Sequence, residues 1–99
     1  MPTYDFNVLS AAAADFYRQN RFHDSLKIFL FIAVIDTESG FYSERVGSCY
    51  ENIGDLHSAK YWYGKAVEEN PTIEPYVRAR ERLKHVNIDF LLDPKSYIK

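Results

Sequence analysis

The sequence predicts an all-α protein built from repeated helix pairs, and three observations support this fold class. Glycine and proline are scarce, with four residues of each among 99, so the chain has little material for long loops. Apolar residues recur at spacings of three and four, the periodicity of one helical face. The chain also resembles itself when it is shifted by 34 residues. We therefore expect short helices joined by tight turns.

The 34-residue shift aligns residues of the same class over much of the chain. Phe16 falls on Tyr50, and Phe29 falls on Tyr63. Identity is low, but apolar, small and turn-forming residues keep their places. The other aligned pairs are Ala13 with Gly47, Asn20 with Gly54, Phe22 with Leu56 and Ile32 with Ala66.

Each repeated unit is expected to form two helices. The turn inside each unit falls at Asn20 or Gly54, the residue types that tolerate the left-handed conformation ending a helix. Asn70-Pro71 closes the second unit, because proline cannot continue a helix. The expected helices are Asn7–Gln19, Phe22–Asp36, Phe41–Asn52 and Leu56–Glu69.

Small residues stand where the helices of a pair should cross. Ala13 and Gly47 leave space for close approach of the two helix axes. Phe29 and Tyr63 are the large residues expected to fill the remaining volume. From Thr72 the chain begins a further helix, which we expect to cover the end of the second unit as a polar capping helix.

The second unit resembles the signature of the tetratricopeptide repeat (TPR) family: Val46-Gly47-x-x-Tyr50-x-x-x-Gly54-x-Leu56-x-x-Ala59-x-x-x-Tyr63-x-x-Ala66-x-x-x-x-Pro71. The first unit is a weaker copy. Leu9 and Ser43 stand where the family often has tryptophan, and Thr37 replaces the closing proline of the first unit. The resemblance implies a right-handed α-α superhelix, a TPR solenoid forming one domain over 1–99. Its parts would be repeat one at 6–37, repeat two at 40–71, the capping helix at 72–87 and a tail at 88–99.

The resemblance also implies a function, which is binding a peptide or a helix of another protein in the concave groove of the superhelix. The groove would be lined by the first helix of each unit and by the capping helix. By their positions in the repeat, the candidate partner-binding residues are Tyr17, Arg18, Phe41, Glu44, Arg45, Ser48, Asn52, Arg78 and Arg82. An ordinary solvated face, with Phe41 packed between the repeats, is the alternative.

Two apolar stretches suggest further interfaces. The helix Phe22–Asp36 is apolar almost all round, and an exposed apolar patch there would bind a partner or a second copy. Tyr61 and Trp62 lie outside the expected core face of their helix, and such aromatic residues are frequent at binding hot spots. Packing of Tyr4 and Phe6 over the first patch, and of Trp62 against the capping helix, are the alternatives. The candidate interface residues are Leu30, Phe31, Val34 and Trp62.

Composition and motifs argue against other classes of function. The net charge of −2 and the pI near 5.9 do not favour nucleic-acid binding. No apolar run is long enough to span a bilayer, and Met1-Pro2-Thr3 does not begin a signal peptide, so we expect a cytoplasmic protein. One cysteine, Cys49, excludes an internal disulfide, and His23 and His57 lack the spacing of metal ligands. We expect no cofactor, no metal and no catalytic activity, because no catalytic motif is present.

Three functions stay open at this stage. The first is an adaptor or scaffold module that binds another protein. The second is a small dedicated chaperone, loosely similar to the TPR chaperones of bacterial type III secretion. The third is a self-assembling structural protein, for example a homodimer, because two repeats are fewer than such arrays usually need for stability.

Overall fold

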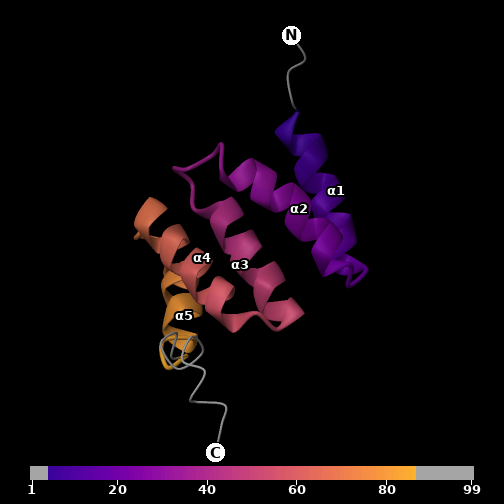
Figure 1. The fold of residues 1–99 in the computed structure, drawn as a ribbon. Helices are drawn as coiled ribbons and strands as arrows, with labels where there is room; N and C mark the ends of the chain where they lie inside the picture. Colours follow the sequence, from indigo (N-terminus) through magenta and orange to yellow (C-terminus); the bar gives the residue numbers. More distant parts are fainter. Residues whose placement is uncertain (1–4, 87–99) are drawn as a thin grey trace, which may run out of the picture.

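The computed structural model describes residues 5–86, and these residues form five α-helices and no strand. The helices follow one another through short connections and are coloured along the chain in Figure 1. Their bounds are α1 Phe6–Arg18, α2 Phe22–Ala33, α3 Phe41–Ile53, α4 Leu56–Glu69 and α5 Glu74–Arg82.

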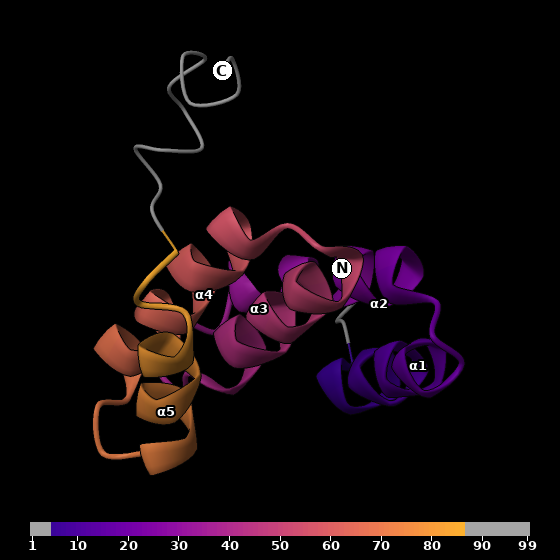
Figure 2. The same cartoon turned by 90° about the horizontal axis from the view of Figure 1, so that it is seen from below.

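Each helix packs mainly against its neighbours in the chain, α1 on α2, α2 on α3, α3 on α4 and α4 on α5. In Figure 2, α1 and α5 lie along one side at opposite ends, and α3 lies between them. The helices α2 and α4 lie along the other side. Alternate helices of the chain therefore form the two sides of the molecule.

The turns inside both helix pairs are those expected. Asn20 and Gly54 have φ of 61° and 99°, which is the left-handed region. The amide that follows each of them donates back to the preceding helix, Arg21 N to Phe16 O and Asp55 N to Tyr50 O, both at 2.9 Å. These bonds occupy carbonyls that the end of a helix leaves unpaired.

A third left-handed residue, Gly40, was not expected. It connects α2 to α3 with φ of 76°, and a Cβ there would lie 2.8 Å from the carbonyl oxygen of Ala66 and 2.9 Å from the ring of Tyr76. Glycine is required both for its backbone conformation and for this close approach.

Two helix ends differ from the sequence-based expectation. The helix expected over Phe22–Asp36 ends at Ala33, because the Asp36 carboxylate turns to the backbone amides of Glu38 and Ser39, at 3.2 and 3.3 Å. The expected capping helix at 72–87 is regular only over Glu74–Arg82. Beyond it, Leu83 and Lys84 donate to carbonyls three residues back, which is the bonding of a tight turn.

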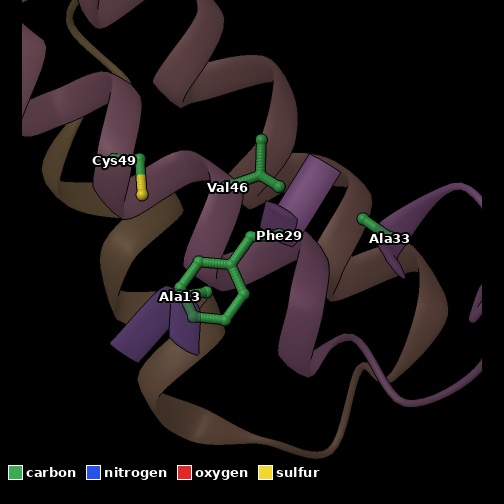
Figure 3. Close-up of a cluster of buried hydrophobic side chains, with 5 residues drawn as sticks. All are labelled: Ala13, Phe29, Ala33, Val46 and Cys49. Carbon is green, nitrogen blue, oxygen red and sulfur yellow. The ribbon is translucent and has the colours of Figure 1, made fainter. Parts of the chain in front are cut away.

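Two apolar clusters hold the helices together. Figure 3 shows the first, in which Phe29 packs with four smaller side chains from α1, α2 and α3. The second joins α4 to α5. The first cluster is made of Ala13, Phe29, Ala33, Val46 and Cys49, and the second of Ala59, Tyr63, Ala79 and Leu83.

The small residues lie at the helix crossings, as predicted. Ala13 and Ala59 are completely buried. Gly47 lies against the ring of Tyr63, where a Cβ would come within 2.8 Å of the ring carbon Cδ1. The absence of a side chain at position 47 therefore allows α3 and α4 to approach each other closely.

Some sequence-based expectations lie outside the described residues. These are the packing of Tyr4, the end of the capping helix at residue 87 and the tail at 88–99. Within residues 5–86, no helix has both the length and the apolar character needed to cross a membrane.

Candidate functional site

Four of the predicted groove residues line one pocket between α1, α2 and α3. The pocket has a volume of about 240 Å³, and we call it the α1–α3 pocket. Its lining includes Phe29, which the sequence suggested only as a core residue. The pocket is lined by Ser10, Ala14, Tyr17, Arg18, Phe29, Phe41 and Arg45.

Hydrogen bonds fix the position of Tyr17 beside this pocket. Its hydroxyl lies 2.5 Å from Ser48 Oγ, and Asn52 Nδ2 donates to it at 2.9 Å. Asn52 Nδ2 also donates to the carbonyl oxygen of Ser48 at 2.8 Å. The network joins α1 to α3, and its members Ser48 and Asn52 were both predicted for the groove.

The two arginines of the pocket are each paired with a carboxylate of their own helix. Arg45 donates from Nε and from its terminal nitrogen to Glu44, at 2.7 and 2.8 Å. Its guanidinium also stands 5.3 Å from the ring centre of Tyr17. The hydrogen bonds to Glu44 raise the pKa of Arg45 above its usual value. Arg18 pairs with Asp15 at the exposed rim.

The predicted residues on α5 do not line this pocket. Arg82 donates to Glu51 Oε1 at 2.6 Å, and the Tyr63 hydroxyl donates to the same oxygen at 2.7 Å. Burial, together with this hydrogen bond, raises the pKa of Tyr63 well above its usual value. Arg78 is exposed and lies 3.9 Å from Glu74. Arg82 therefore links α5 to α3, whereas Arg78 stays at the surface.

A larger pocket, of about 490 Å³, lies along α4 beside α5; of its lining, the sequence analysis had singled out only Tyr61 and Trp62. We call it the α4–α5 pocket. The signal available in the sequence was the aromatic pair Tyr61-Trp62 with lysines at positions 60 and 65. The pocket is lined by His57, Ser58, Lys60, Tyr61, Trp62, Gly64, Lys65, Glu68 and Arg80.

Trp62 is half-buried and packs against the first apolar cluster, which includes Phe29 and Val46. The sequence analysis left packing against the capping helix as the alternative. The indole packs against residues of the first three helices, and it also lines the α4–α5 pocket together with Arg80 of α5.

The apolar residues expected on α2 divide into two groups. Leu30 packs against the first cluster. Val34 is 61% exposed and Phe31 is 38% exposed, while Ile35 beyond the helix is 50% exposed. A small apolar patch around Val34 and Ile35 is therefore exposed at the end of α2. That Phe31 and Val34 form an interface stays a prediction.

The titratable groups show no preformed metal site within residues 5–86, where no cluster of three or more His, Cys, Asp or Glu side chains is placed to hold an ion. Cys49 is completely buried, and burial raises the pKa of its thiol. A thiol with a raised pKa is a poor nucleophile at neutral pH.

Comparison with known proteins adds no family to these observations. No family model matches the chain, and no curated protein shows significant similarity to it.

Proposed function

We propose that this chain is a TPR-type protein-binding module, folded as a right-handed superhelix of two helix pairs and a capping helix. Three features support the proposal. Left-handed turns recur at Asn20 and Gly54, 34 residues apart. Small residues recur at the crossings, Ala13 and Gly47. Alternate helices lie on opposite sides of the molecule (Figure 2).

The binding site in this proposal is the α1–α3 pocket, and its lining is the observation that carries the proposal. Tyr17, Phe29 and Phe41 supply aromatic surface, and Phe41 is 44% exposed although it is large and apolar. Such a hollow fits an apolar or aromatic side chain of a peptide or helix from another protein.

Charge contributes little to binding in this proposal, because Arg18 and Arg45 already have carboxylate partners. Full burial of one large apolar side chain stabilises a complex by about 1.5–3 kcal/mol. One pocket of this size therefore supports modest affinity, and the partner needs further contacts along α3 or α5. An adaptor and a chaperone would both use this groove.

Selection of peptides from a displayed random library tests the proposal. The full chain is immobilised, and enriched peptides are then measured against purified variants by fluorescence anisotropy. Phe41→Glu should weaken binding at least tenfold, because it places a charge in the apolar pocket. Tyr61→Glu is the matched control, since Tyr61 is exposed on α4, outside the α1–α3 pocket. If no peptide is enriched, or if both variants lose binding equally, this site is wrong.

Self-association is a second candidate function, favoured by the apolar patch at the end of α2. Val34 and Ile35 are both at least half exposed there. Light scattering across a tenfold range of concentration should then show a dimer, and Val34→Glu should return it to a monomer. A constant monomer mass would exclude the homodimer. The cytoplasmic location stays a prediction.

A further inference from the structure

The α4–α5 pocket has a counterpart one repeat earlier, at the surface formed by α2 and α3. Val46 of that surface belongs to the first apolar cluster, and Leu26 and Leu30 pack against it. The earlier surface therefore contributes to the core. A shift of 34 residues carries lining residues of the pocket back to it: Lys60 to Leu26, Gly64 to Leu30 and Arg80 to Val46.

A helix covers that earlier surface. Trp62 of α4 packs against the first apolar cluster, and α2 and α4 lie along the same side of the molecule (Figure 2). In a stacked array each unit buries its apolar face against the next unit. The surface formed by α4 and α5 is therefore one that a further helix would cover, as α4 covers the surface of α2 and α3.

Gly64 in the middle of α4 supports a close neighbour at this pocket. Glycine inside a helix destabilises it relative to alanine, yet a Cβ at Gly64 would meet nothing within 4 Å among the described residues. At Gly47, in contrast, the missing side chain makes room for the ring of Tyr63. The bare backbone at Gly64 would likewise let a side chain of a docked helix approach α4.

The aromatic rings of the pocket suit an apolar side chain. Tyr61 and Trp62 stand edge to face, with ring centres 5.6 Å apart, and Tyr61 is 60% exposed. Tyrosine, tryptophan and arginine are the residues most often found at binding hot spots, and Arg80 lines the same pocket.

The cations of the pocket already have partners, so they do not require an acidic ligand. Their aliphatic stems can pack against an apolar side chain while the charged groups stay at the surface. Charge therefore decides little about the occupant. Lys65 pairs with Glu69 at 4.0 Å, Arg80 pairs with Glu81 at 3.7 Å, and Lys60 donates to the carbonyl oxygens of Lys84 and Val86.

We propose that the α4–α5 pocket docks one amphipathic helix of another protein, which places a large apolar side chain beside Trp62 and over Gly64. The occupant is a helix because α4, which covers the equivalent surface, is a helix. It binds reversibly because two cations and a glycine replace the three apolar residues of the earlier repeat, so this surface tolerates water. The proposal is independent of the α1–α3 pocket, because it uses other residues.

A library of helical peptides tests the proposal, with Trp62 as the reporter. The peptides share a frame of alanine, glutamate and lysine and vary at i, i+3, i+4 and i+7 among apolar residues other than tryptophan. They are selected on the full chain. Because Trp62 is the only tryptophan in the sequence, enriched peptides should shift its emission to shorter wavelength and reduce its quenching by acrylamide.

Gly64→Leu is the decisive variant, because its side chain would occupy the space over α4 while its Cβ displaces no neighbour. It should weaken peptide binding about tenfold or more, with a thermal midpoint at or above that of the wild type. Tyr61→Ser should also weaken binding and, because Tyr61 is exposed, should leave the fold intact. Lys27→Leu is the matched control, since it adds leucine at an exposed position of α2 outside both pockets and should not change binding.

Several outcomes would overturn the proposal. Failure to enrich any helix, or equal binding to the wild type and to Gly64→Leu, would exclude helix docking at this pocket. An indole already shielded from acrylamide in the dilute chain, and unaffected by every peptide, would show that the pocket is covered without a partner. A change of emission when the chain alone is concentrated would identify a second copy as the occupant. Peptides selected for the α1–α3 pocket should bind Gly64→Leu normally, so the two proposals fail separately.

Discussion

The two helix pairs form the same kind of crossing with different side chains. At the first crossing Ala13 and Phe29 are both buried in one apolar cluster. At the second, Gly47 faces the ring of Tyr63, and the Tyr63 hydroxyl donates a hydrogen bond to Glu51. The first crossing shares its apolar cluster with Val46 and Cys49 of α3, whereas the second is joined to a polar network around Glu51.

The polar network of the second pair extends to the capping helix. Glu51 Oε1 accepts hydrogen bonds from Tyr63 and from Arg82 of α5. In the first pair, Ser25 Oγ donates to the carbonyl oxygen of Ala13 at 2.8 Å and accepts from Cys49 Sγ of α3 at 3.6 Å. The comparison teaches that one repeat pattern can be coupled to the next element either mainly by apolar packing, as at the first crossing, or through hydrogen bonds to a shared carboxylate, as at the second.

The largest loss of stability is expected at the first crossing, between α1 and α2. Phe29→Ala should lower the free energy of unfolding by about 3–5 kcal/mol, because Phe29 is only 2% exposed and its removal leaves a cavity. Urea unfolding followed by circular dichroism measures the change. Phe41→Ala is the control, and it should cost much less because Phe41 is exposed. Equal losses in the two variants would show that Phe29 is not the centre of this cluster.

The second crossing should also lose stability, here when a methyl group is added and not when a ring is removed. Gly47→Ala would place a Cβ 2.8 Å from Tyr63 Cδ1 and should cost about 1–3 kcal/mol through overpacking, offset in part by about 1 kcal/mol of helix propensity. Thermal unfolding of Gly47→Ala in the wild type and in Tyr63→Leu tests this explanation. The loss should shrink in the second background. A Gly47→Ala variant that is more stable than the wild type would contradict the close approach.

The smallest loss of stability is expected when the Tyr63 hydroxyl is removed. This hydroxyl shares the Glu51 carboxylate with Arg82 of the capping helix. Tyr63→Phe should cost about 1 kcal/mol at neutral pH, because it removes one hydrogen bond to Glu51. The pKa of Tyr63 is raised above the usual 10.0, so above about pH 10 the unfolded chain releases this proton while the folded chain retains it. Stability should therefore fall as pH rises beyond that value.

Unfolding midpoints measured from pH 8 to 11 test this loss of stability at alkaline pH. Tyr63→Phe should reduce the loss without removing it, because burial also raises the pKa of Tyr76. An identical slope in Tyr63→Phe and the wild type would contradict the raised pKa of Tyr63.

Much of the helical arrangement could be predicted from sequence because its causes are local or periodic. The turns at Asn20 and Gly54 follow from residue types that accept positive φ. The first turn of α4 follows from the cap at Asp55. The end of α2 was misplaced because Asp36, which could equally continue a helix, bonds to the backbone of the following loop.

The candidate site was predictable only in part. Tyr17, Arg18, Phe41 and Arg45 come together as their repeat positions indicated. Arg82 was predicted for the groove, and its bond to Glu51, 31 residues away, was not foreseen. A pairing over that separation depends on how α5 packs on α4, which the helical period does not specify.

The sequence by itself determined the helices, their turns and the small residues at their crossings, because these depend on backbone conformation and on spacing along one helix. The tertiary structure decided which side chains meet across helices. It brought Gly40 against Tyr76, Glu51 between Tyr63 and Arg82, and Lys60 to the carbonyl of Val86. Such contacts depend on the angles and distances between packed helices, which are set by the whole core.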